Sequence, residues 1–452
     1  MDAYDELRER ARADGIEFFL PLFVDLHGKP CAKAVPAAAI EVMLAGGAGF
    51  GGFAVGDIGQ SPADPDLAAI PDPDSYTRLP WRPEVAVLHC DPAVDGRPWP
   101  YAPRVILRRL LDRLRSERGW VFKTGMELEY SLLRRTPDGA LALADPLDTA
   151  DKPCYDARGV ARMWPHLSTV SRYLNQLGWD NYANDHEDAN GQFEQNFGYA
   201  DALTTADRAV FFRFLVHELA HQAGLLATFM PKPFADRTGN GMHVHSSLWT
   251  DAGQELFADP TDGRGLGLSK TAYAYVGGLL AHGRAMAAVT CPTVNSYKRV
   301  GGAGAPTSGA TWAPGHVCYG GNNRTVLLRV PAPGRVEHRG VDGSANPYLA
   351  SAVLLAAGLD GIDRDLDPGE PVTDDLFALD PATVAGRGVA ALPATLAEAV
   401  EAFVADPVVT AALGEVPGGT FADYYAGVKR AEFAAYHAQV TPWELDRYLA
   451  LF

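Results

Sequence analysis

The sequence predicts an α+β fold divided into two unequal domains. Segments with strand and helix patterns follow one another without the regular strand–helix–strand alternation of a dinucleotide-binding domain. The chain has 452 residues, which is more than one hydrophobic core usually organises. A proline-rich break, "DGRPWPYAPR", precedes the first long helical pattern. Because Arg97 lies within this break, we expect domains over residues 1–97 and 98–452.

The smaller, N-terminal domain is expected to be rich in strands. Residues 1–14 have a charged helical pattern, and residues 16–36 are expected to form two strands around a turn at residues 27–30. The density of glycine, proline and aspartate over residues 45–75 is typical of ordered loops and turns. Residues 84–92 have the pattern of a further strand.

The larger domain is expected to contain both helices and strands. Helices are predicted from about residue 103, over residues 202–224 and 268–290, and in the alanine-rich tail after about residue 395. Thr204 or Thr205 is the expected N-cap of the second of these helices. Strands are predicted at residues 121–133, 240–249, 324–331 and 335–340.

Net charge and composition narrow the class of protein. The net charge of −17 and the isoelectric point near 5.1 argue against binding to a nucleic-acid backbone. The five cysteines form no Cys-x-x-Cys pair, which is typical of a reducing compartment. The N-terminus does not resemble a signal peptide, and no apolar run approaches the roughly 18 residues that span a membrane. We expect a cytoplasmic enzyme without nucleic-acid or membrane partners.

Three familiar motifs occur without convincing context. "GAGFGG" at residues 47–52 follows a helix-like segment instead of a strand, and "GRGLGLSKT" has no glycine directly before its lysine. "HELAH" matches the zinc-peptidase pattern, in which His217 and His221 bind zinc and Glu218 is the base. It lies in an otherwise ordinary amphipathic helix, so a zinc peptidase is kept only as a rival hypothesis.

Acidic and imidazole side chains recur on the predicted strands and beside them: Glu127, Glu129, Glu187, Glu194, His243, His245 and Glu337. Residues two apart on a strand share a face, so Glu127 pairs with Glu129 and His243 with His245. Neighbouring buried carboxylates require a cation, and mixed oxygen and nitrogen ligands suit magnesium or manganese. From spacing alone, the two histidines could share one metal ion, have different roles, or be ordinary core residues.

A set of arginines accompanies these acids: Arg299, Arg324, Arg329, Arg335 and Arg339. Guanidinium groups bind carboxylate and phosphate oxygens in a fork. Acids that bind metal ions, together with arginines that bind anions, are typical of sites that catalyse phosphoryl transfer.

Six motifs that occur in order carry a family resemblance: "GMELEY", "HEDANGQFEQNF", "KPFADRTGNGMHVHSSLW", "NSYKRV", "NNRTVLLRVP" and "RVEHRGVDGSANPYLASAVLLAAGLDGI". Together they resemble the glutamine synthetase family from about Arg104 to the C-terminus, and the preceding residues are similar to that family's small β-grasp domain. The resemblance implies a bifunnel of antiparallel strands. It also implies a ligase that joins glutamate to ammonia through a γ-glutamyl phosphate, with ATP and two or three Mg²⁺ or Mn²⁺ ions.

The resemblance also implies a role for each residue that matches a family motif. The implied ligands of the first metal ion are Glu129, Glu187 and Glu194. The implied ligands of the second are Glu127, His243 and Glu337. Glutamate is assigned Glu129, Gly239, Arg299 and Arg339. The nucleotide is assigned Tyr199, His245, Ser247, Arg324, Arg329 and Arg335. Catalytic roles are assigned to Arg324, to Arg339 and, from the neighbouring subunit, to Asp57.

Two departures from the family concern the amine. The loop "VGGAGAPTSGATWAP" after Arg299, which includes Gly304, has no acid where ammonia-using members have a glutamate. In the N-terminal domain, Ala54 replaces the family's aspartate, and Asp57 and Asp64 are the nearest acids. Since small residues leave room for a carbon substituent on nitrogen, we hypothesise that methylamine is the acceptor and γ-glutamylmethylamide the product.

The glycine-rich segments resemble the type III (GlnT-like) subgroup, which also contains γ-glutamylmethylamide synthetases. The alternatives are a glutamine synthetase that uses ammonia, a γ-glutamyl ligase for ethylamine or a polyamine, and a catalytically silent relative. The resemblance further implies a dodecamer of two hexameric rings, with active sites between subunits. In this interpretation "VTPWELDRYLALF" is the helix that joins the rings.

Overall fold

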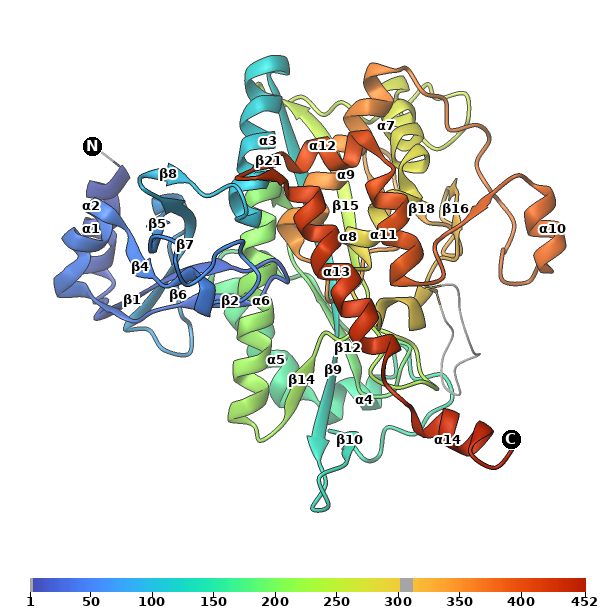
Figure 1. The fold of residues 1–452 in the computed structure, drawn as a ribbon, viewed down its shortest axis with the longest axis horizontal. Coiled ribbons are helices and arrows are strands. Elements are labelled where there is room, and N and C mark those ends of the chain that lie inside the picture. Colours follow the sequence, from blue (N-terminus) through green and yellow to red (C-terminus); the bar gives the residue numbers. More distant parts are fainter. Residues whose placement is uncertain (1–2, 301–311) are drawn as a thin grey trace.

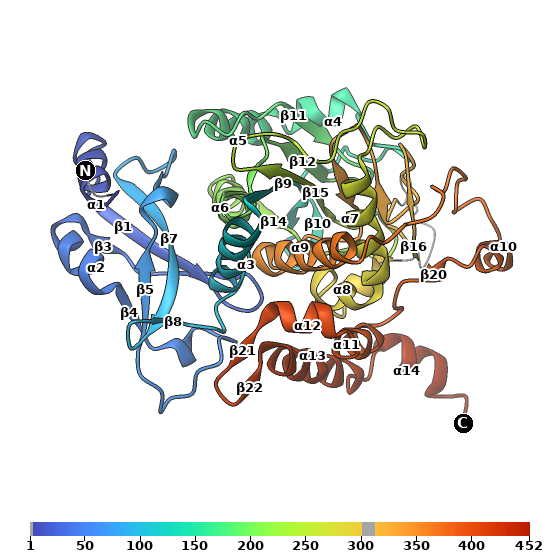
Figure 2. The same ribbon diagram turned by 90° about the horizontal axis from the view of Figure 1, so that it is seen from above.

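The computed structural model describes residues 3–300 and 312–452 and confirms the α+β fold. A small N-terminal sheet domain lies beside a larger body, in which helices cover a long twisted sheet (Figure 1, Figure 2). None of the helices in these two ranges combines the length and the apolar character needed to cross a bilayer.

The N-terminal sheet has the strand order β2-β1-β7-β5-β4. Strand β1 (Phe18–Val24) runs parallel to β7 (Val85–Val94), while the other pairs are antiparallel. The remaining elements are α1 (Ala3–Ala13), β2 (Pro30–Ala32), β3 (Val35–Pro36), α2 (Ile40–Gly46), β4 (Ala48–Phe50), β5 (Leu67–Pro71), β6 (Thr77–Arg78) and β8 (Arg97–Pro98). The predicted N-terminal helix and the hairpin around residues 27–30 are confirmed.

The glycine-rich stretch differs from its prediction. Residues 45–75 contain strands β4 and β5 as well as turns, because Phe50, Leu67 and Ala69 bury their side chains in a small core. The boundary near Arg97 stays a prediction: β8 still pairs with β7, and α3 (Pro103–Arg118) begins six residues after Arg97.

The second sheet has the strand order β11-β12-β9-β15-β19-β18-β17, with β10, β13 and β14 also paired to β9. Its long strand β9 (Trp120–Arg135) is antiparallel to β15 (Met242–Thr250) over nine residue pairs. The other strands are β10 (Leu141–Leu143), β11 (Ala183–His186), β12 (Gln192–Asn196), β13 (Ala200–Asp201), β14 (Leu226–Thr228), β17 (Tyr319–Gly320), β18 (Leu328–Arg329) and β19 (Val336–His338). Strand formation within residues 324–331 and 335–340 is thus shorter than predicted.

Helices pack around this sheet and close the main core. They are α3, α4 (Ala157–Arg162), α5 (Trp164–Gln176), α6 (Ala202–Gln222), α7 (Lys270–Ala281), α8 (Gly283–Thr290) and α9 (Pro347–Asp363). The predicted tail helices are α11 (Leu396–Val404), α12 (Pro407–Leu413), α13 (Phe421–His437) and α14 (Pro442–Tyr448). The pairs β16 (His316–Val317) with β20 (Ala390–Ala391) and β21 (Glu415–Val416) with β22 (Gly419–Thr420) are short, as is α10 (Pro381–Gly386).

Two local predictions were wrong. Helix α6 begins after Asp201 with no side-chain cap, because the hydroxyl of Thr205 instead donates to the Thr124 carbonyl of β9 at 2.7 Å. The helix predicted over residues 268–290 is divided at His282 into α7 and α8. The imidazole of His282 bonds Asp406 through Nδ1 at 2.6 Å and Asp360 through Nε2 at 2.9 Å. The residue between α7 and α8 therefore contacts α9 and the start of α12.

Candidate active site

Strand register gathers the predicted site residues on one face of the second sheet. Across β12, β9 and β15, Glu194 lies opposite Glu129, and His243 lies opposite Glu127. On the other side of β15, His245 lies opposite Glu337, and Glu337 lies opposite Arg329 of β18. Because pairing partners are about 5 Å apart, antiparallel pairing alone brings most of the acids into one cavity.

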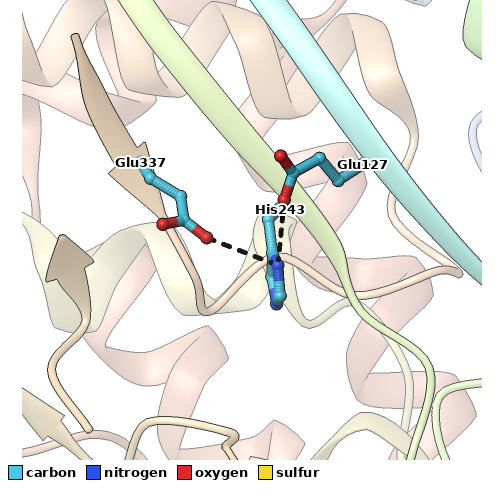
Figure 3. Close-up of side chains that lie close together, drawn as sticks. All are labelled: Glu127, His243 and Glu337. Atoms are coloured by element: carbon cyan, nitrogen blue, oxygen red, sulfur yellow. Dashed lines mark ion pairs between the residues drawn. The ribbon is translucent and has the colours of Figure 1, made fainter. Parts of the chain in front are cut away.

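One metal-ligand group is that of Glu127, His243 and Glu337, whose ligand atoms all lie within 4.8 Å of one another (Figure 3). The Nδ1 atom of His243 is 3.6 Å from Glu127 Oε2 and 3.4 Å from Glu337 Oε1. These are the residues that the resemblance assigns to the second metal ion.

A second group places Glu129 and Glu194 with the same histidine. His243 Nε2 is 3.7 Å from Glu129 Oε1, so the two ring nitrogens face the two groups. Glu187, assigned to the same ion as Glu129 and Glu194, lines the same cavity but groups with Cys154 and Asp188. The assignment of Glu187 to the first metal ion stays a prediction.

The electrostatics of the acids favour bound cations. Burial, followed by repulsion from Glu129 and Glu127 respectively, raises the pKa of Glu187 and Glu194 well above its usual range. Burial also acts to raise the pKa of Glu127, but hydrogen bonding to His243 and His245 outweighs it and holds that pKa well below its usual range. Divalent cations at these carboxylates offset the repulsion and suit the mixed oxygen and nitrogen donors, so the residues fit Mg²⁺ or Mn²⁺.

Glu129 is oriented by groups that the sequence did not reveal. Its Oε2 accepts from the Gly241 backbone N–H at 2.7 Å and from the Gln192 side-chain amide at 2.9 Å. The same amide nitrogen of Gln192 donates to the Gly239 carbonyl at 3.0 Å. A Cβ atom at Gly241 would lie 2.7 Å from Arg299 Nη2 and 2.9 Å from His243 Nε2, so this glycine leaves the cavity open.

The predicted arginines surround the acids. Arg339 donates to Glu337 Oε1 at 2.7 Å, and Arg329 donates to Glu337 Oε2 at 2.8 Å. Arg299 donates to the carbonyls of Gly340 and Arg339 at 3.2 and 3.3 Å. Exposed Arg324 and Arg335 line the same cavity of about 450 Å³. Anion-binding groups and metal-binding groups therefore face one space.

A second cavity, of about 360 Å³, shares Glu127, His245 and Arg335 with the first. Predicted base-side residues Tyr199 and Ser247 line it, and the Trp249 indole donates to Ser247 Oγ at 2.9 Å. The Lys123 ammonium lies 4.3 Å from the Trp249 ring centroid and also lines this cavity. An aromatic and polar end adjoining a cationic, acidic end fits a nucleotide with its phosphates toward the acids.

His245 differs from His243 in its surroundings. Its Nε2 bonds Glu127 Oε1 at 2.9 Å, and its buried Nδ1 has no hydrogen-bond partner among the described residues. None of the three metal-ligand groups found in residues 3–300 and 312–452 includes His245. The two histidines share a strand face, and the arrangement favours different roles for them.

Two predicted amine-side features remain untested. Asp57 accepts a 2.8 Å bond from His27 Nε2 in the N-terminal domain and lines neither cavity of its own subunit. Its predicted role concerns a neighbouring subunit. Gly304 and most of the loop after Arg299 lie outside the described residues, whereas Trp312 and Ala313 line the larger cavity.

The zinc-peptidase alternative receives no support from the described part of the chain. His217 and His221 belong to none of the metal-ligand groups found there. The His217 ring packs edge-on against Phe229, and Glu218 accepts a bond from Gln222 at 2.8 Å. These are ordinary contacts of side chains on the outer face of α6.

Comparison with known proteins agrees with this geometry. Residues 100–448 match the family described as glutamine synthetase, catalytic domain. The chain is 44% identical over 448 residues to the glutamate–methylamine ligase of Methyloversatilis universalis, covering 99% of both proteins. It is 45% identical over 445 residues to a glutamine synthetase of Rhizobium leguminosarum bv. phaseoli, covering 98% of this chain and 99% of that protein.

Solved structures agree as well. The structure titled as a GmaS/ADP complex in conformation 1 superposes with a TM-score of 0.91 at 49% identity, covering 98% of this chain and 99% of that one. The structure of apo GmaS without ligand gives a TM-score of 0.88 at 48% identity over the same shares. With a matched catalytic domain, full-length relatives and a shared fold, the chain belongs to the glutamine synthetase family of ATP-dependent ligases.

Proposed function

We propose that the chain is a glutamate–methylamine ligase. It joins the γ-carboxylate of glutamate to methylamine and converts ATP to ADP and phosphate. The observation that carries this proposal is the paired cavity, in which two metal-ligand groups and the arginines face one space. The full-length similarity to a protein named glutamate–methylamine ligase supports the choice of amine.

In this proposal the described residues position two successive attacks. Arg299 and Arg339 hold glutamate, and Arg324 lies where the phosphoryl group is transferred. The γ-carboxylate oxygen attacks the terminal phosphorus of ATP and ADP leaves, and the amine nitrogen then attacks the acyl carbon while phosphate leaves. Divalent ions held by the acids supply charge neutralisation, which phosphoryl transfer needs more than a protein nucleophile.

The remaining site assignments form part of the same proposal. Glu129 with Glu194 and Glu187 holds the ion near glutamate, and Glu127, His243 and Glu337 hold the ion at the ATP phosphates. Arg329, Arg335 and His245 meet phosphate oxygens, and Tyr199 and Ser247 lie at the base. Gly239 lies against glutamate, since it lines the same cavity as Arg299 and Arg339.

The amine side of the cavity supports a small alkylamine. The sequence has no acid between Arg299 and Pro314. Asp188, which is 7% exposed, lines the cavity together with Tyr155 and Trp312. A carboxylate beside aromatic faces suits a cation that carries a methyl group. We infer that Asp188 receives the amine proton in place of the absent loop acid.

The proposal includes self-association. Asp57 lines neither active-site cavity of its own subunit, and the C-terminal helix α14 exposes Trp443, Leu445 and Tyr448. Both observations support a dodecamer in which the N-terminal domain of one subunit completes the site of the next. A monomer by light scattering that retained full turnover would contradict shared sites.

The test is product identification with purified protein. Glutamate, methylamine, ATP and Mg²⁺ together are expected to give γ-glutamylmethylamide and an equal amount of ADP, with neither formed when one component is omitted. Glu129→Ala is expected to abolish both products, while His217→Ala, outside the site, keeps them. Glutamine formed from ammonia at the higher rate would favour the alternative, glutamine synthetase, to which the Rhizobium relative is equally similar.

A further inference from the structure

A third cavity, of about 510 Å³, lies between the two domains and shares no lining residue with the two active-site cavities. One wall is the β1–β2 turn, residues 26–30, and the others come from α6, β14, the start of α9 and α13. The Asn346 side-chain amide, at the N-cap of α9, donates to the carbonyls of Asp25 and Leu26 at 3.1 Å each. The cavity is therefore bounded by a fixed contact between the domains.

The lining carries positive charge only. Lys29, Arg213 and Lys429 line the cavity with His27 and His217, and no described carboxylate lines it, although the chain has a net charge of −17. Some of these cationic side chains form ion pairs with carboxylates that do not line the cavity. Lys429 is 3.1 Å from Glu432, and Lys29 is 3.8 Å from Asp25. The imidazole of His27 likewise pairs with the carboxylate of Asp57.

Arg213 is the unpaired member. Its guanidinium donates to the Ala345 carbonyl at 2.8 Å and lies against the Met242 sulfur. Among the described residues Asp342 attracts Arg213, but no carboxylate forms an ion pair with it. Its Nε is buried without a hydrogen-bond partner in that part of the chain. Burial lowers the pKa of Arg213 to about 10, and attraction to the Asp342 carboxylate offsets only part of this effect.

A buried cation without a counter-ion is costly, and an anionic ligand offsets that cost. Between the cations the wall is apolar, with Phe214, Phe229 and Leu349. The cations come from three separate elements, so a ligand with negative groups at both ends of a short carbon chain meets more than one of them. An amino acid is disfavoured because no carboxylate in the lining pairs with an ammonium group.

We propose that this cavity binds a small organic dicarboxylate, at a site separate from the one that binds glutamate. A bound dianion would connect the β1–β2 turn of the N-terminal domain to α6 and α13 of the catalytic domain. The inference rests on the lining of this cavity and does not depend on which amine the enzyme uses.

The test is calorimetric titration of the full-length protein, without nucleotide or divalent metal, at constant ionic strength. Glutarate is the probe, and inorganic phosphate and glutamate are the comparison ligands. Glutarate is expected to bind one site per chain in wild type and equally in Arg299→Gln, which alters the catalytic cavity. Arg213→Gln and Lys29→Gln are expected to weaken it about tenfold or more, through loss of a charged hydrogen bond.

Lys29 has a side chain that is 57% exposed, so Lys29→Gln tests the site even if Arg213→Gln fails to fold. Lys270→Gln, with the same charge change at an 82% exposed side chain outside the cavity, is the matched control and is expected to bind like wild type. The proposal is overturned if wild type shows no saturable binding of glutarate. It is also overturned if Arg299→Gln loses glutarate binding while Lys29→Gln retains it. Tighter binding of phosphate or glutamate than of glutarate in the Arg299→Gln background also overturns it.

Discussion

Glu127 lies between the two histidines of β15, with its Oε2 3.6 Å from His243 Nδ1 and its Oε1 2.9 Å from His245 Nε2. One carboxylate thus contacts both rings, while only His243 also approaches Glu337 and Glu129. Because of this asymmetry, we expect substitutions of His243 and His245 to have different effects on ligand binding. His243→Ala is expected to weaken binding of one Mn²⁺ ion by about 100-fold, because it removes a ligand of the ion assigned to Glu127, His243 and Glu337.

His245→Ala is expected to retain the Mn²⁺ stoichiometry and to weaken ATP binding instead. Electron paramagnetic resonance titration of Mn²⁺ and calorimetry with a non-hydrolysable ATP analogue distinguish the two variants. Equal losses of metal from both variants would contradict different roles for the histidines.

Removal of the metal ions is expected to destabilise the protein, because Glu194 is buried near Glu127, Glu187 and Glu129. Glu194→Gln removes one repelling charge. In the presence of a chelator at pH 7.5 we expect it to raise the free energy of unfolding by on the order of 1 kcal/mol. With saturating Mn²⁺ we expect the variant to be less stable than wild type, because it lacks one ligand of the metal ion. Denaturant unfolding measured in both conditions checks the reversal, and a variant less stable than wild type in chelator would contradict it.

Gly241→Ala tests the open space between Arg299, His243 and Glu129. The added Cβ would lie 2.7 Å from Arg299 Nη2, so these groups must move. We expect kcat/KM for glutamate to fall about 100-fold or more, since small misplacements at a reacting centre have effects of that size. The matched control is Gly427→Ala in α13, where nothing lies within 4 Å of the added atom. Full activity of Gly241→Ala would show that this region does not bind substrate.

His282 predicts a pH-dependent stability away from the site. Hydrogen bonding to Asp406 raises the pKa of His282, and Asp360 adds to the effect. A raised pKa means that its stabilisation is fully present below the unfolded value of about 6.5 and is lost as pH rises through the folded value. The difference in urea midpoint between wild type and His282→Gln is therefore expected to shrink from pH 6 to pH 9. His437→Gln, on the exposed end of α13, is the control, and a pH-independent difference would contradict the prediction.

Residues on paired strands were the most predictable part of the site. Alternation on a strand is a local property, so the shared faces of Glu127 with Glu129 and of His243 with His245 followed from spacing alone. Gln192, Gly241 and Lys123 could not be found in this way. Their roles depend on which strands become neighbours, and a lone glutamine, glycine or lysine has no local signal of such contacts.

The fold shows the same limit. The α+β class, the tail helices and the hairpin near residue 28 follow from local patterns. The division at His282 does not, because its cause is the pair Asp360 and Asp406, which lie 78 and 124 residues further along the chain. Thr205 likewise resembled a cap in sequence but bonds to β9 in the fold.

Competition between methylamine and ammonia tests the central claim most directly. The two amines are supplied together at equal free-base concentration with glutamate, ATP and Mg²⁺, and γ-glutamylmethylamide and glutamine are counted in the same sample. Because the loop after Arg299 has no acid for free ammonium, the account predicts at least about tenfold more γ-glutamylmethylamide, which corresponds to about 1.4 kcal/mol between the two transition states. An excess of glutamine would contradict it and identify the chain as an ammonia-using member of the family.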